Sequence, residues 1–194
     1  MSGCIDNALY AQGMKEWQDR IVEATLGIKT DIANGTPQVK DTRPQWHEYF
    51  LKLAKDVSTR SNCCRRKVGA VIVKDNHIIA TGYNGTPAGT TNCFDGGCPR
   101  CNHTHTTGEK LDECLCVHAE QNAICQAAKY GNAIDGGHIY ITCSPCLTCL
   151  KLIINAGITR IVFSEWYKKF NEQEINLIKE SGLVVIPPQE KGDR

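Results

Sequence analysis

The chain of 194 residues has the composition of an ordinary soluble globular protein, with 41% hydrophobic and 22% charged residues. Its net charge of +1 provides no global field to attract a long polyanion. We therefore expect no nucleic-acid partner, although a local groove can be basic on a neutral protein. No apolar stretch is long enough to span a bilayer, which excludes a membrane-spanning protein.

Twelve cysteines are a high count for a chain of this length. In a secreted protein they would suggest disulfides, but residues 1–30 contain no apolar signal-peptide core. We therefore expect a cytoplasmic protein whose thiolates bind metal.

The first 43 residues differ from the rest of the chain. Met14, Trp17 and Ile21 fall at roughly helical spacing, and the Asn-Gly-Thr-Pro sequence at 34–37 breaks that pattern. We interpret residues 1–43 as an N-terminal extension and linker of unassigned function, for which packing or subunit contact is favoured over chemistry. Residues 44–190 are then the functional domain.

From Gln45 onward, helix-like and strand-like segments alternate. A helical face at 46–57 precedes two strand-like runs, 68–73 and 77–81, which Lys74-Asp75-Asn76 joins as a hairpin. The later elements carry recognisable start and stop signals. They are a helix at 118–130 closed by Gly131, a strand at 139–142, a helix with Ser144 as N-cap and Pro145 in its first turn, a strand at 158–163, a helix capped by Asn171 and Glu174 that ends near Gly182, and a strand at 183–186.

This order predicts an α/β protein, a three-layer α/β/α sandwich around a mixed five-stranded sheet. Residues 86–115 interrupt the alternation with a Gly- and Cys-rich stretch that has no periodicity. A loop of that length is usually functional or tied down by something.

Two short motifs carry the chemistry. His118-Ala119-Glu120 and Pro145-Cys146-Leu147-Thr148-Cys149 offer one imidazole and two thiols to a tetrahedral zinc ion, with one coordination position left for water. Cys146 and Cys149 are three residues apart on a predicted first helical turn, so both sulfurs can reach one ion. Glu120 is too close to His118 to be an obvious fourth ligand, but it is well placed to shuttle protons. The pattern H-x-E followed by P-C-x-x-C is the zinc-deaminase signature.

A less specific interpretation is also open for these residues. His118 can be a core histidine, and Cys146 and Cys149 can be buried small residues or a redox pair. The joint pattern, in its strand-then-helix context, favours zinc.

A longer set of segments resembles a known family, the deoxycytidylate (dCMP) deaminases of the bacterial, fungal and phage type within the zinc-dependent cytidine deaminase superfamily. The segments that carry the resemblance are 61–73, 81–89, 116–124 and 142–149, and the similarity covers roughly residues 45–190. The resemblance implies hydrolysis of dCMP to dUMP and ammonia for thymidylate synthesis. It also implies activation by dCTP, inhibition by dTTP with Mg²⁺, and a homo-oligomer, commonly a hexamer.

The resemblance also implies residue roles. His118, Cys146 and Cys149 would bind the catalytic Zn²⁺, and Glu120 would be the proton shuttle. The substrate contacts would be the Ala119 backbone to the pyrimidine carbonyl, the Ser144 carbonyl to the exocyclic amine and Asn84 to the deoxyribose. Tyr167 matches a family tyrosine near the substrate or effector site, with a core-edge aromatic as the alternative. Apart from the resemblance, a monophosphate substrate needs a cation, for which we choose Arg60. The effector site would use Gly82, Tyr83, Asn84 and Gly85. For Asn84 the alternative is a turn residue in a left-handed backbone conformation. Arg60 belongs to a basic run with 65–67, which can equally be a solvated surface cluster.

Related deaminases often hold a second, structural zinc. The resemblance suggests Cys63 and Cys93 as ligands, and we choose Cys101 and Cys116 to complete the set. Cys98 in place of Cys101, and Cys114 in place of Cys116, are the alternatives, and free thiols in a reducing cell are a further one.

Two other functions compete with a free-nucleotide deaminase. A deaminase acting on dCTP or on a base in a polynucleotide would use the same motif, but the sequence shows no basic stripe for a strand. A non-catalytic zinc-binding module would have no use for Glu120.

Overall fold

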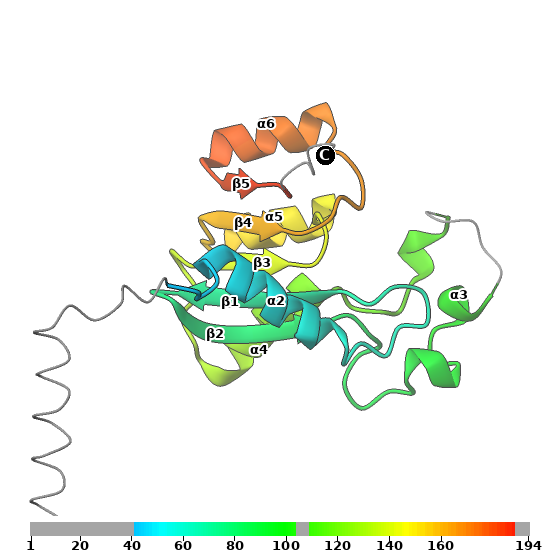
Figure 1. Cartoon of the computed structure of the whole chain (residues 1–194). Helices are drawn as coiled ribbons and strands as arrows, with labels where there is room; N and C mark the ends of the chain where they lie inside the picture. The colour runs from blue at the N-terminus through cyan, green and yellow to red at the C-terminus, as the bar shows by residue number, and fades with distance from the viewer. Residues whose placement is uncertain (1–40, 104–108, 189–194) are drawn as a thin grey trace, which may run out of the picture. The chain divides into compact units, whose positions relative to one another are not determined.

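The computed structural model describes residues 41–103 and 109–188 (Figure 1). Pro44–Arg194 forms one compact unit, which is described here by itself. The helix predicted around Met14, Trp17 and Ile21 lies outside the described residues. None of the described helices is both long and apolar enough to cross a membrane.

The sheet begins with a hairpin of β1 (Gly69–Lys74) and β2 (His77–Tyr83). The two residues between the strands, Asp75 and Asn76, have φ angles of 51° and 61°. Two successive left-handed residues make the turn whose twist matches a right-twisted hairpin, and Asp and Asn tolerate that conformation best after glycine. The hairpin predicted from Lys74-Asp75-Asn76 is confirmed.

The remaining strands are β3 (His138–Ile141), β4 (Arg160–Phe163) and β5 (Val184–Ile186). They complete one five-stranded sheet in the order β2-β1-β3-β4-β5. Strand β1 is antiparallel to both β2 and β3, whereas β3, β4 and β5 run parallel. The sheet is therefore mixed, as predicted.

Helices cover both faces of this sheet (Figure 1). Strand β1 alternates between them: Val71 and Val73 pack with α2 (Trp46–Ser58), whereas Ala70 and Ile72 pack on the opposite side. The helices on that side are α4 (Ala119–Tyr130), α5 (Leu147–Asn155) and α6 (Glu172–Ser181). The predicted three-layer sandwich is confirmed.

The helix ends follow the predicted signals in three of four cases, one of them Gly182, which ends α6 with a φ of 69°. Gly131 ends α4 with a φ of 69°, and Asn171 caps α6 by accepting from the Glu174 N–H. The start predicted for α5 is wrong, because its N-cap is Cys146 rather than Ser144. The Ser144 hydroxyl is used elsewhere: it accepts from the Tyr167 N–H at 3.0 Å and donates to the Lys168 carbonyl at 3.1 Å.

The aperiodic stretch leaves the sheet and returns to it at one point. Gly85 and Val117 pair as an isolated bridge, with N–H to carbonyl distances of 3.2 and 2.8 Å. Between them lie the short helical turns η1 (Cys93–Asp95), α3 (Pro99–Asn102) and η2 (Leu111–Glu113). The returning chain enters α4 directly, so the loop ends at the first turn of that helix.

Candidate active site and metal centres

The N-termini of α4 and α5 bring the predicted zinc ligands together. His118 is the N-cap of α4, Cys146 is the N-cap of α5, and Cys149 lies one turn further along α5. The His118 Nδ1 lies 3.5 Å from the Cys146 Sγ and 3.3 Å from the Cys149 Sγ. A tetrahedral zinc with ordinary Zn–N and Zn–S bond lengths separates such atoms by about 3.6 Å. The three side chains therefore fit a zinc ion, and as a three-ligand set they leave a position for water.

Glu120 is the buried acid of the site. It stands in the first turn of α4 with only 4% of its surface exposed. Burial raises the pKa of its carboxyl, and the group is close enough to Cys149 to interact with that thiol. A carboxyl whose pKa is raised toward neutrality can accept and return a proton at the pH of a cell.

Hydrogen bonds among the three side chains favour the thiolate form of Cys146. A hydrogen bond from Cys149, together with the hydrogen bond and charge of His118, lowers the pKa of Cys146 to about 3 against the opposing effect of burial. The same arrangement raises the pKa of Cys149, and the bond to Cys146 raises the pKa of His118. The imidazolium and the remaining thiol must lose their protons when a metal binds. The metal affinity of the site therefore falls as the pH falls.

Close packing against β2 fixes the position of α4. A Cβ on Gly82 would collide with the Ala119 carbonyl oxygen and the Ala123 nitrogen, so only glycine lets the helix come this near. The Asn122 side chain donates to the Tyr83 carbonyl at 2.7 Å and ties the helix to the end of β2. Gly82, predicted as an effector residue, thus has a packing role that the sequence did not reveal. A lone glycine in a strand was its only signal.

Asn84 directly follows β2 and makes three hydrogen bonds through its side chain. Its Oδ1 accepts from the Val68 N–H and the Ser61 hydroxyl, both at 2.8 Å, and its Nδ2 donates to the Arg66 carbonyl at 2.8 Å. The alternative of a left-handed backbone is wrong: in the described part of the chain, positive φ outside glycine occurs only at Asp75, Asn76 and Lys110. Asn84 fastens the segment that precedes β1.

Tyr167 lies against the basic run. The Arg66 guanidinium carbon is 4.7 Å from the centre of the Tyr167 ring, a cation–π arrangement, and Arg66 also interacts with Cys143. The charge of Glu120 in turn raises the pKa of Cys143, in addition to the larger effect of burial. Arg66 is therefore the arginine on the catalytic side, although Arg60 was the one chosen from the sequence.

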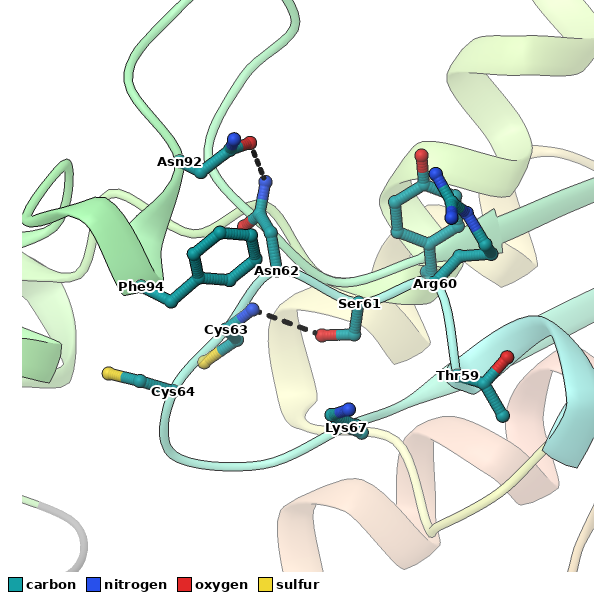
Figure 2. Close-up of a pocket in the computed structure, with 10 residues that line it drawn as sticks. Thr59, Arg60, Ser61, Asn62, Cys63, Cys64, Lys67, Asn92 and Phe94 are labelled. Carbon is teal, nitrogen blue, oxygen red and sulfur yellow. Dashed lines mark hydrogen bonds between the residues drawn. The ribbon is translucent and has the colours of Figure 1, made fainter.

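Arg60 lines a different hollow, a cavity of about 540 Å³ that Figure 2 shows. Tyr83, Lys67, Asn62 and Phe94 contribute to its wall. The structure thus brings together Arg60, predicted to bind substrate phosphate, and Tyr83, predicted to bind an effector. The described residues that line this cavity include Cys63 of the cysteine-rich loop, but not Glu120 or the catalytic zinc ligands His118, Cys146 and Cys149.

A second set of sulfurs is buried in the loop. The sulfurs of Cys63, Cys93, Cys101 and Cys116 all lie within 4.8 Å of one another. These are the four residues that we chose for a structural zinc. The alternatives Cys98 and Cys114 also lie close, in an overlapping group with Cys101 and Cys116.

A sequence profile of the cytidine and deoxycytidylate deaminase zinc-binding region matches residues 44–165. The chain belongs to this family. The profile describes a zinc-binding region, and the histidine and cysteine clusters agree with it, so Zn²⁺ is the metal of this family member.

Individual deaminases resemble the chain over the same part. It is 44% identical to the deoxycytidylate deaminase of Schizosaccharomyces pombe over 153 residues, which is 76% of this chain and 46% of that protein. It is 45% identical to the enzyme of Saccharomyces cerevisiae over 143 residues, or 74% of this chain and 45% of that protein. The chain thus spans less than half the length of these fungal relatives.

The fold also resembles solved deaminase structures. The dCMP deaminase of cyanophage S-TIM5, crystallised with dCMP and dUMP, is 35% identical and superposes with a TM-score of 0.59. That match covers 75% of this chain and 98% of the phage protein. The family member described here therefore shares the deaminase fold over nearly the whole length of the phage enzyme.

Proposed function

We propose that the chain is a zinc-dependent hydrolase that converts dCMP and water to dUMP and ammonia and so supplies dUMP for thymidylate synthesis. One observation carries the proposal: the buried carboxylate of Glu120 adjoins a site of one imidazole and two sulfurs. The identity to deoxycytidylate deaminases supports the choice of substrate, since two fungal relatives and a phage enzyme bear that name.

The residues of the chain divide the chemistry among them. Zinc, when bound by His118, Cys146 and Cys149, supplies Lewis acidity that makes water a nucleophile at neutral pH. Glu120 takes the proton of the attacking water and delivers it to the ring nitrogen N3. The oxygen adds to C4 of the pyrimidine. Glu120 then moves the proton of the added hydroxyl to the amine, the C4–N4 bond breaks, and the C4 oxygen becomes the carbonyl of dUMP. One water is consumed and one ammonia leaves.

Substrate contacts follow from the family resemblance. The Ala119 N–H would hold the pyrimidine carbonyl, and the Ser144 carbonyl would accept from the amine. Asn84 would contact the deoxyribose through its amide. Tyr167 would lie beside the nucleotide, and Arg66 at its ring would meet the phosphate. Arg60, chosen from the sequence for this role, lines the separate cavity beside Tyr83.

We also propose that nucleotides regulate the protein and that it assembles as an oligomer. We place an activating dCTP, or an inhibiting dTTP with Mg²⁺, at Gly82, Tyr83, Asn84 and Gly85. The cavity beside Tyr83, with Arg60 and Lys67 in its wall, has the cationic lining that a triphosphate needs. The protein would act in the cytoplasm as a homo-oligomer, a hexamer by resemblance, with residues 1–43 as an extension to residues 44–190.

Ammonia release from the full chain tests the proposal. Separate incubations with dCMP, dCTP, deoxycytidine and a single-stranded oligonucleotide should show turnover of dCMP. Turnover of dCTP or of the oligonucleotide alone would overturn the substrate. Bound zinc without turnover of any of the four would support a zinc-binding module instead.

A matched pair of variants tests the role of Glu120. Glu120→Gln keeps the size of the side chain but removes the proton acceptor, so kcat should fall by about 10²–10⁴-fold while the zinc content stays unchanged. Glu172→Gln makes the same chemical change at an exposed position of α6 and should leave kcat unchanged. Equal activity of the two variants would exclude Glu120 as the proton shuttle.

A further inference from the structure

The cysteine-rich loop has a small core that consists of cysteine side chains. Cys63, Cys93, Cys98, Cys101 and Cys116 are buried together, and Cys114 packs against them. Cysteine is a small side chain, and so few of them bury too little apolar surface to order three short helical turns. Something other than hydrophobic burial must hold this loop.

The six sulfurs form two overlapping groups of four. One group is Cys63, Cys93, Cys101 and Cys116; the other is Cys98, Cys101, Cys114 and Cys116. Within each group all sulfurs lie within 4.8 Å of one another. The groups share two members, Cys101 and Cys116, so they describe two tetrahedra with a common edge.

The separations are those of zinc-bound thiolates. The Sγ of Cys101 is 4.0 Å from that of Cys63, 4.0 Å from that of Cys116 and 3.7 Å from that of Cys114. The Cys98 and Cys114 sulfurs are 3.9 Å apart. Two sulfurs on one tetrahedral zinc are separated by about 3.8 Å, whereas a disulfide bond is about 2.05 Å long.

Backbone donors point at the outer sulfurs. The Leu115 N–H donates to the Cys98 Sγ at 3.4 Å, and the N–H groups of Arg65 and Arg66 donate to the Cys63 Sγ. Such bonds stabilise thiolates. A backbone donor also reaches Cys93, so outer members of both groups have the features of metal ligands.

We propose that these six cysteines bind two zinc ions as one cluster, in which Cys101 and Cys116 bridge the ions. Cys63 and Cys93 complete the first tetrahedron, and Cys98 and Cys114 complete the second. Each thiol releases its proton to solvent when it binds. Six thiolates around two Zn²⁺ carry the same net charge as four thiolates around one, so the second ion adds bonds without adding uncompensated charge. The sequence left open whether Cys98 or Cys101, and whether Cys114 or Cys116, binds a structural zinc. In the two-ion cluster all four are ligands.

The zinc content of the full chain tests this cluster. Protein purified without chelator should carry three zinc ions per chain by native mass spectrometry and elemental analysis, one of them at His118. Two ions per chain would overturn the proposal. The count does not depend on turnover, and Glu120→Gln should bind the same three ions, so failure of the catalytic proposal would leave this result unaffected.

Cadmium substitution tests the bridges directly. In protein loaded with cadmium-113, two cluster resonances should show scalar coupling to each other through the shared sulfurs, and the cadmium at His118 should be uncoupled. Absence of that coupling in fully loaded protein would exclude bridging. This measurement uses the unmodified chain, so it does not depend on whether a variant folds.

Serine variants give the matched comparison. Cys98→Ser removes an outer ligand of the second ion and should lower the count from three zinc ions to two. Cys64 is the control, because it lies beside the cluster but belongs to neither group, and its thiol donates to the Cys101 carbonyl at 3.3 Å. Cys64→Ser should retain three ions. Loss of an ion in Cys64→Ser alone would contradict the assignment.

Discussion

We expect Gly82→Ala to lower turnover through packing, although Gly82 is neither a proposed zinc ligand nor the proposed proton shuttle. The new Cβ would collide with the backbone of α4 at Ala119 and Ala123, and the Ala123 Cα would be 3.0 Å away. Backbone atoms cannot rotate aside as a side chain can, so the helix and β2 must separate by roughly 1 Å. Overpacking of this kind costs about 1–3 kcal/mol, which lowers the Tm of a domain of this size by roughly 2–12 °C.

The same displacement reaches the proposed catalytic residues, because His118 caps α4 and Glu120 lies in its first turn. A misplacement of roughly 1 Å at a catalytic group lowers kcat about 100-fold. Activity should be measured well below the Tm and normalised to bound zinc. Thermal unfolding followed by circular dichroism gives the stability of the same samples.

Gly131→Ala is the control at the other end of α4. Gly131 has a φ of 69°, but a Cβ there would meet nothing within 4 Å. Alanine in that conformation costs about 1–2 kcal/mol without moving the helix. Its Tm should therefore fall while its kcat stays at the wild-type value. Wild-type kcat in Gly82→Ala, or an equal loss in both variants, would refute the reasoning.

Two further substitutions test hydrogen bonding and pH dependence. Asn84→Ala removes the acceptor of Val68 and Ser61 and the donor to Arg66. The free energy of unfolding should therefore fall by about 1–3 kcal/mol. A rise in KM for dCMP with no change in Tm would mean that the residue contacts substrate only. His138 has its pKa lowered by burial and by the nearby charges of Arg160 and His47. Because the folded protein then binds this proton less readily than the unfolded chain, stability should decline as the pH falls below 6.5 toward the folded-state pKa. Denaturant unfolding at pH 5.5 and 7.5 should show a smaller decline in His138→Gln, and an equal decline in both proteins would remove His138 as the cause.

Local signals predicted those parts of the fold that depend on neighbours in sequence. The hairpin follows from Asp75 and Asn76, which tolerate positive φ, and the start of α6 follows from a reciprocal bond between Asn171 and Glu174. The catalytic ligands were predictable for the same reason, because Cys146 and Cys149 share one helical turn. Their partner His118 was recognised through the motif and not through geometry.

Contacts between distant segments were not predictable in this way. Ser144 resembles an N-cap in sequence, but its hydroxyl is engaged by Tyr167 and Lys168, which arrive from beyond β4. Arg60 and Arg66 are equivalent in a basic run, and only the path of the chain brings Arg66 to the Tyr167 ring. Spacing alone likewise leaves the ligand choice among the loop cysteines open, because their sulfurs meet through tertiary folding.

The bridge between Gly85 and Val117 has a consequence for how the family can vary. It closes the cysteine-rich excursion with two backbone hydrogen bonds at its base, so the sheet meets the same two residues whatever lies between them. The entropy of closing such a loop grows only slowly with its length. Insertions, deletions or an exchanged segment between residues 86 and 116 are therefore tolerated by the sheet if the base is kept. This excursion is the natural place to graft a new segment without redesigning α4 and α5.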